Sequence, residues 1–152
     1  MTDIPRSALW LGLAGVVPFV WGVLTQMSVP LQDMATGGLG PRFVGPYVQL
    51  FYGAVILSFM SGVLWGFATR AKGGHATLGY GLSVLPALWV FFTTGGGPVA
   101  ATQALVMGFV GLLGLDYLFW RWGLAPAWWM RLRVLLSGLV LACLVLTYLH
   151  AR

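Results

Sequence analysis

Hydrophobic residues run along this chain in five long stretches, and nearly every charged residue lies between them. The stretches cover residues 7–27, 44–69, 75–94, 98–120 and 126–149, and the last is short unless its helix begins near Pro126. A helix needs about 20 apolar residues to cross the ~30 Å hydrocarbon core of a bilayer. Membrane β-strands span only about 10 residues, with strict alternation. The pattern therefore predicts an all-α integral membrane protein, a compact bundle of five transmembrane helices in a single domain over 1–152.

The scarcity of charge supports a membrane location. The chain has eight basic and three acidic residues and no glutamate, so that 7% of its residues are charged and 59% are hydrophobic. In a water-soluble domain about a quarter of the residues are charged. The net charge of +5 could suit nucleic acid, but the basic residues flank the apolar stretches, often beside tryptophan, which suits anionic lipid headgroups. We expect the lipid bilayer as a partner, and no nucleic acid.

The basic residues are divided unequally between the two sides of a five-span chain. The N-terminus, the 70–74 loop and the 121–132 loop share one side, which carries Arg6, Arg70, Lys72, Arg121, Arg131 and Arg133. The opposite side carries only Arg42 and Arg152. Because cytoplasmic loops are enriched in Lys and Arg, this asymmetry predicts a cytoplasmic N-terminus and a C-terminus outside.

Small residues recur at every fourth position of the second span. They are Ala54, Ser58, Gly62 and Gly66. Lipid tails are as apolar as side chains, so transmembrane helices associate through close approach at small residues and through hydrogen bonds. We expect the second helix at the centre of the bundle, packed through this stripe. A similar series, Ala100, Ala104 and Gly108, makes the fourth helix its expected neighbour.

Two prolines and a group of tryptophans mark further features of the bundle. Pro18 and Pro86 lie in the middle of the first and third spans, where each removes a backbone donor and should kink its helix. Tryptophans gather around the segment before the fifth span and are expected to anchor a cytoplasmic interface belt. They are Trp120, Trp122, Trp128 and Trp129.

Asp116 is the one acidic residue well inside a span, four residues before the end of the fourth. An ionisable residue at such a depth is a candidate for function. We expect an intramembrane ion pair with Arg133 at the start of the fifth helix, with Arg121 and Arg131 as competing partners. A role in moving a proton or a substrate is the alternative.

No pattern in the sequence names a reaction. His75 and His150 fall at opposite ends of the bundle, about a bilayer apart, which argues against a haem held by both. Paired metal ligands and a nucleophile with a base are not visible, so no catalytic residue, metal or cofactor is expected. Loop 28–43 is Gly-rich and could fold over an outer pocket.

The run from Tyr52 to Gly66, with Trp65 near its end, resembles the core motif of a small membrane family of unknown function. Eukaryotic transmembrane protein 69 belongs to that family, which also has bacterial members. The family pattern contains Leu-Ser-Phe-Leu-Gly-Gly and ends in Trp-Gly, and Met60 and Ser61 depart from it conservatively. Other similar positions are Gly15, Pro18, Phe19, Pro86, Asp116, Pro126, Trp128, Leu132 and Arg133. The resemblance implies a multi-pass protein of the bacterial inner membrane, or of the mitochondrial inner membrane in a eukaryote, and it supplies no activity.

Two functions remain open at this stage. The first is a non-enzymatic accessory, scaffold or assembly component that packs its helices against a partner, in a homo-oligomer or a larger membrane complex. The alternative is a protein that binds or carries a lipid, a quinone or a tetrapyrrole, working as an oligomer. An enzyme is disfavoured because a catalytic constellation is not visible.

Overall fold

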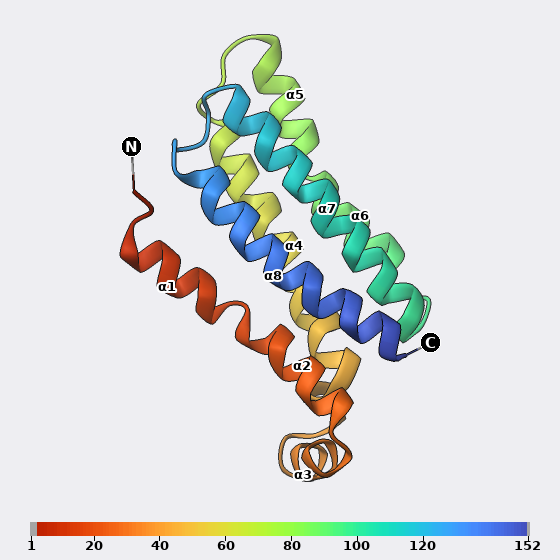
Figure 1. Ribbon diagram of the computed structural model, residues 1–152. Helices are drawn as coiled ribbons and strands as arrows, with labels where there is room; N and C mark the ends of the chain where they lie inside the picture. Colours follow the sequence, from red (N-terminus) through yellow and green to blue (C-terminus); the bar gives the residue numbers. More distant parts are fainter. Residues whose placement is uncertain (1–2, 152) are drawn as a thin grey trace.

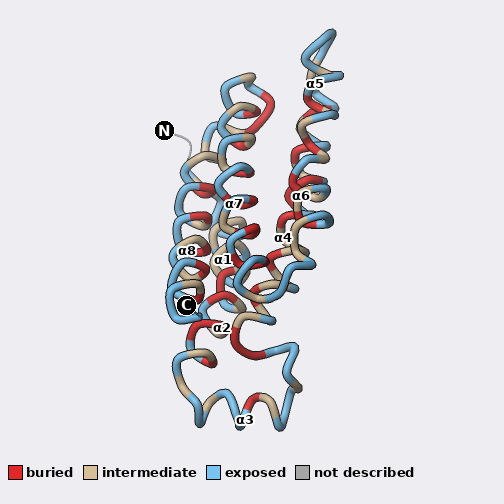
Figure 2. Tube along the Cα trace, turned by 90° about the vertical axis from the view of Figure 1, so that its right-hand side faces the viewer, coloured by how far each residue is buried: buried red, intermediate tan, exposed pale blue. Residues whose placement is uncertain are grey.

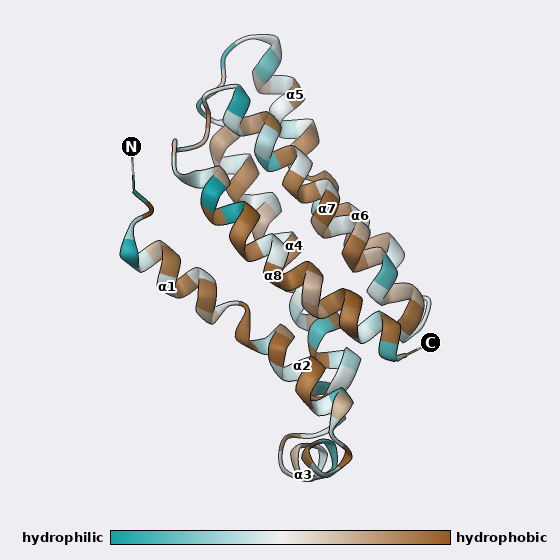
Figure 3. Cartoon of the chain, in the orientation of Figure 1, coloured by the Kyte–Doolittle hydropathy of each residue, from teal (hydrophilic) through white to brown (hydrophobic). Residues whose placement is uncertain are grey.

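The computed structural model describes residues 3–151, and all regular structure within them is helical (Figure 1). Five helices are long and apolar enough to cross a membrane: Arg6–Met27, Gly45–Ala68, Gly74–Thr93, Pro98–Arg121 and Trp129–His150. Hydrophobic residues cover the middle of the bundle, and the hydrophilic ones gather towards its ends (Figure 3). The predicted fold class and the number of spans are confirmed. The fifth helix begins at Trp129, three residues after the predicted start near Pro126.

Two of the five spans are broken into paired helices. The first consists of α1 (Arg6–Ala14) and α2 (Val17–Met27), and the third of α5 (Gly74–Ser83) and α6 (Leu85–Thr93). In each span the break lies just before the proline, because proline lacks the N–H donor and its ring clashes with the carbonyl four residues earlier. Pro18 and Pro86 therefore stand in the first turns of α2 and α6. The hydroxyl of Ser61 accepts a 2.9 Å hydrogen bond from the N–H of Ala87, just after the second break.

The two remaining long helices, α7 (Pro98–Arg121) and α8 (Trp129–His150), run unbroken beside α4 (Gly45–Ala68). Helix α4 packs against α2, α5, α6 and α7, so it lies at the centre of the bundle, as expected. Glycine in a left-handed conformation precedes α5 and α7, at Gly73 (φ 60°) and Gly97 (φ 89°). A side chain with a Cβ would be strained at these two turns.

The face that α4 buries is not the predicted one. Its inward side chains include Leu57 and Leu64, which are fully buried, whereas Ser58, Gly62 and Gly66 are exposed. The expectation that the small-residue stripe joins α4 to the rest of its own chain is therefore wrong for these three residues, whereas Ala54 of the stripe and Tyr52 of the same motif pack against the core. The physical reason is that α4 is apolar on every side, so spacing alone did not distinguish its inner from its outer face.

Other glycines provide the close contacts within the bundle. A Cβ added to Gly53 would lie 2.9 Å from Cδ1 of Leu105, and one added to Gly108 would lie 3.0 Å from Cδ1 of Trp89. The Trp89 indole in turn donates a 2.7 Å hydrogen bond to the carbonyl of Ala104. Ala104 and Gly108 of α7 are buried, as their predicted packing role requires, and Ala100 is exposed. Because glycine has no Cβ, a side chain of a neighbouring helix can lie directly against the backbone at these two positions.

The segment between the first two spans is helical rather than a loop. Helix α3 (Val29–Leu39) and a short 3-10 turn (Pro41–Phe43) lie across one end of the bundle (Figure 2). Val29 and Met34 of α3 are 67% and 68% exposed, and Ala35 is buried. A short helix with exposed apolar side chains at the end of the spans suits the boundary between headgroups and acyl chains.

Candidate functional site

A buried ion pair joins α7 to α8. Asp116 is fully buried, and Arg133 is 5% exposed. The Nε of Arg133 donates a hydrogen bond of 2.6 Å to Oδ2 of Asp116. The structure thus brings together the two residues that the sequence singles out as a pair, and it leaves Arg121 and Arg131 exposed.

The other carboxylate oxygen of Asp116 is bound by a tryptophan. Nε1 of Trp129 donates a 2.9 Å hydrogen bond to Oδ1. Trp129 and Arg133 are four residues apart in α8, so both side chains leave the same face of the helix. Each oxygen of the buried carboxylate therefore has a donor, which offsets the cost of removing its charge from water.

The four tryptophans predicted to form an interface belt have different surroundings. Trp129 is turned inward to Asp116, a contact that the predicted interface belt did not include, and its place in that belt stays a prediction. Trp122 packs against His75, with 5.2 Å between ring centroids. Trp120 is 37% exposed, and Trp128 is partly buried. Trp129 turns inward because its indole N–H donates to the carboxylate of Asp116. Its position near the end of a span does not predict this bond.

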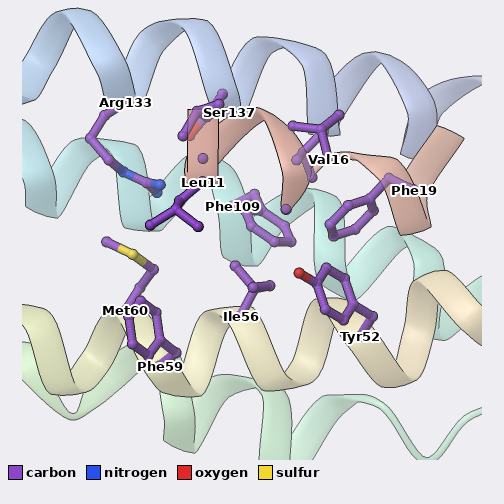
Figure 4. A pocket seen from close by; sticks show the side chains of 14 residues that line it. Leu11, Val16, Phe19, Tyr52, Ile56, Phe59, Met60, Phe109, Arg133 and Ser137 are labelled. Carbon is purple, nitrogen blue, oxygen red and sulfur yellow. The ribbon is translucent and has the colours of Figure 1, made fainter. Parts of the chain in front are cut away.

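A pocket of about 310 Å³ lies beside the ion pair (Figure 4). Helices α1 and α2 form one side of it, α8 another, and α4 and α7 the floor. Its walls are mainly apolar and aromatic, with contributions from Val16, Phe19, Ile56, Met60, Phe109 and Val140. Figure 4 shows the guanidinium of Arg133 reaching in from α8, and the hydroxyl of Tyr52 pointing up from α4.

Two buried polar atoms of the pocket wall have no hydrogen-bond partner among the described residues. They are Nη2 of Arg133 and Oγ of Ser137. Ser137 is 1% exposed and stands one turn after Arg133 on α8. Buried polar groups are nearly always paired, so these two unpaired donors make the pocket a candidate site for a hydrogen-bonding ligand or for water. The sequence reasoning missed Ser137, although its spacing of four residues from Arg133 was a usable signal.

A second polar group, near the opposite end of the bundle, joins α2 to α4. The fully buried Gln49 donates a 2.7 Å hydrogen bond from Nε2 to the carbonyl of Phe19. Its side chain occupies the space above Gly22, where an added Cβ would lie 2.5 Å from Cγ of Gln49. The backbone N–H of Gly45 donates to the hydroxyl of Thr25 at 2.8 Å. These bonds join α2 to α4, whereas Oε1 of Gln49 and Oε1 of Gln26 have no hydrogen-bond partner among the described residues.

The metal-ligating side chains of the described residues lie apart from one another. Within residues 3–151, His, Cys, Asp and Glu side chains do not form a group of three that could hold a metal ion. Cys143 is a free thiol, partly buried in α8. The arrangement that is present, an arginine and a serine facing an apolar pocket, can hold the oxygen of a ligand but contains no paired nucleophile and base.

Comparison of the sequence with known protein families identifies relatives of this chain. The model of a family described as a protein of unknown function (DUF3429) matches residues 4–149. The chain belongs to this family. It is 36% identical to transmembrane protein 69 of Xenopus tropicalis over 152 residues, which cover 95% of the chain and 54% of that relative. It is also 31% identical to transmembrane protein 69 of Mus musculus over 93 residues, 59% of the chain and 34% of the relative.

The relatives confirm the predicted resemblance and the assignment as a membrane protein. The chain spans about half the length of the frog relative. No solved structure matches it. The family description contains no activity.

Proposed function

We propose that the protein is a non-catalytic component of a membrane complex, which holds a partner transmembrane helix against the outward face of α4. One observation carries the proposal: a Cβ added to Gly62 or Gly66 would meet no atom within 4 Å. Bare helix backbone therefore faces the surroundings of the bundle at these positions. In lipid, backbone that a second helix can approach closely is a common basis of association.

The chain's own packing leaves Ser58, Gly62 and Gly66 exposed, although Trp65 beside them packs on Tyr80 of α5 with 4.7 Å between the ring centroids. Gly22, Gly53 and Gly108 already serve the internal contacts, and each lies against a side chain of another helix. The stripe of Ser58, Gly62 and Gly66 is an additional surface, which supports an intermolecular role. Exposed aromatic side chains stand beside it, with Phe59 65% and Trp65 47% exposed, and they could cover the sides of a docked helix.

The proposed setting is a bacterial inner membrane, or a mitochondrial inner membrane in eukaryotic relatives, with the N-terminus in the cytoplasm or matrix. The six-to-two distribution of Lys and Arg supports this orientation. The N-terminal end of α1 and the starts of α5 and α8 lie towards the same end of the bundle (Figure 1). That arrangement agrees with the side that the charge asymmetry assigns to the cytoplasm.

Site-specific photo-crosslinking in native membranes tests the docking face. A photoreactive amino acid at position 58 should give one adduct of defined mass, whereas the same group at Val145 should give none. Val145 of α8 is a matched control because it is 42% exposed and lies away from the stripe. The mass of the adduct tells whether the docked helix belongs to a second copy or to another protein. Labelling of lipid alone at position 58 would contradict the proposal.

A second function, binding of a small apolar molecule, is favoured by a separate observation. The pocket beside the ion pair contains the unpaired Nη2 of Arg133 and the unpaired Oγ of Ser137. The helix-docking proposal does not explain these two atoms. They belong to the interior of the bundle, and their chemistry narrows the class of ligand.

A further inference from the structure

We infer that the pocket between α1, α2, α4 and α8 binds an uncharged amphiphile, whose carbonyl or ester oxygen accepts hydrogen bonds from Nη2 of Arg133 and Oγ of Ser137. The inference rests on the second function proposed above and is independent of helix docking on α4. The two sites are built on different residues, except that Phe59 of α4 lines the pocket and also stands beside the stripe that contains Gly62.

The two donors, Nη2 of Arg133 and Oγ of Ser137, are placed to bind one acceptor atom of the ligand or two neighbouring acceptor atoms. The Arg133 side chain is 7% exposed, and Ser137 is 1% exposed, so neither group is free to reach bulk water. Residues four apart on a helix face the same direction. Both donors therefore point towards one region of the pocket, and a ligand oxygen with two lone pairs can accept a hydrogen bond from each.

The charge of the site selects a neutral ligand. The carboxylate of Asp116 already binds the Nε of Arg133, so the positive charge of the guanidinium is balanced inside the protein. A second anion would leave a net negative charge in a region of low dielectric, which is strongly disfavoured. The Nη2 group can still donate, because a guanidinium carries five N–H bonds. A carbonyl or ester oxygen satisfies it without adding charge.

The size of the pocket limits the rest of the molecule. Its 310 Å³ lies at the lower end of the roughly 300–1,000 Å³ of small-molecule sites. Such a volume suits a single ring or the first part of an acyl chain, and it does not suit a macrocycle such as a tetrapyrrole. The aromatic rings of Phe19 and Phe109 meet edge to face at 5.9 Å and form an apolar wall for that part.

The pocket is open to the hydrocarbon rather than to water. Leu11 of α1 and Phe59 of α4 line it and are 75% and 65% exposed, so they stand at its mouth. Both residues belong to membrane spans, so the mouth of the pocket faces sideways into the bilayer. Helix α1 diverges from α4 towards the N-terminus (Figure 1). A ligand dissolved in the membrane can therefore enter with its polar end first and leave its tail among the lipids.

Two photoreactive probes test the inference on the purified full chain in lipid nanodiscs. One is the methyl ester of a diazirine-bearing fatty acid, and the other is the free acid of the same length, used at neutral pH. The ester should label residues of the pocket wall and reach half-maximal labelling at a lower concentration than the acid. Ser137→Ala should raise that concentration about two- to tenfold, the effect of losing one hydrogen bond. Ile56→Trp should abolish the labelling by filling the pocket.

Ser58→Ala, which removes a hydroxyl from the outside of α4, is the matched control and should bind the ester like the unaltered protein. Thermal unfolding of each variant establishes that it is folded. Three results would overturn the inference: equal or stronger labelling by the acid, ester labelling unchanged in both Ser137→Ala and Ile56→Trp, or no pocket labelling of the folded protein, which would mean that water alone occupies the site.

Discussion

Arg133 donates its Nε–H to Asp116, and its guanidinium reaches towards an apolar pocket (Figure 4). The 2.6 Å bond from Nε to Oδ2 ties α8 to α7, and Nη2 is buried without a partner. One side chain thus joins two helices and also lines the pocket for which ligand binding is proposed above. The ion pair holds the guanidinium in place, so the proposed binding depends on it.

The first prediction concerns the coupling within the ion pair. Asp116→Ala and Arg133→Ala should each lower the free energy of unfolding by about 3–5 kcal/mol, because each leaves an unpaired buried charge. The double variant should lose less than the sum of the two, which is the mark of interacting groups. Thermal and denaturant unfolding in detergent measure all three. Additive losses would show that the two residues act separately, and Arg131→Ala, at an exposed position, should change little.

The second prediction concerns Trp129. Trp129→Phe keeps an aromatic ring but removes the Nε1 donor, so Oδ1 of Asp116 loses its partner. We expect a loss of about 0.5–2 kcal/mol in the free energy of unfolding. Trp120→Phe, at a position that is 37% exposed, is the matched control and should stay within about 0.5 kcal/mol of the unaltered protein. Equal effects of the two changes would remove the structural role of the Trp129 indole.

The third prediction separates the inner and outer glycines of α4. Gly53→Leu should destabilise the bundle by about 1–3 kcal/mol or more, because even a Cβ there lies 2.9 Å from Leu105. Gly62→Leu should leave the thermal stability of the isolated protein unchanged, since nothing lies within 4 Å of the added Cβ. In membranes it should weaken the crosslink expected from position 58. Destabilisation of the isolated protein by Gly62→Leu would place that residue inside the bundle and contradict the exposed stripe.

The fourth prediction concerns topology. A reporter enzyme that is active only outside the cytoplasm should be active when fused after Arg152, and inactive when fused in the 70–74 loop. The reason is the bias of Lys and Arg towards the N-terminal side of the five spans. Activity of the loop fusion with silence of the C-terminal fusion would invert the orientation and leave the five-span bundle intact.

Sequence alone determined the number of spans, their approximate bounds, the two proline breaks and the residues of the ion pair. Each of these depends on a strong local signal. A run of about 20 apolar residues can be satisfied only by crossing the bilayer. A proline inside a span removes a specific backbone bond. Asp116, a carboxylate that is costly in hydrocarbon, needs a nearby cation, and Arg133 enters the next helix on the same side.

Only the tertiary structure decided which sides of the helices face one another. In water, the inner face of a helix is apolar and its outer face polar, but in lipid both faces are apolar, so periodicity gives little direction. Side chains of distant segments decided three features by the way they fit together. Gly53 rather than Gly62 lies at a helix contact, Trp129 turns inward, and Arg133 and Ser137 line one pocket. These relationships arise between helices, and no single stretch of the chain contains them.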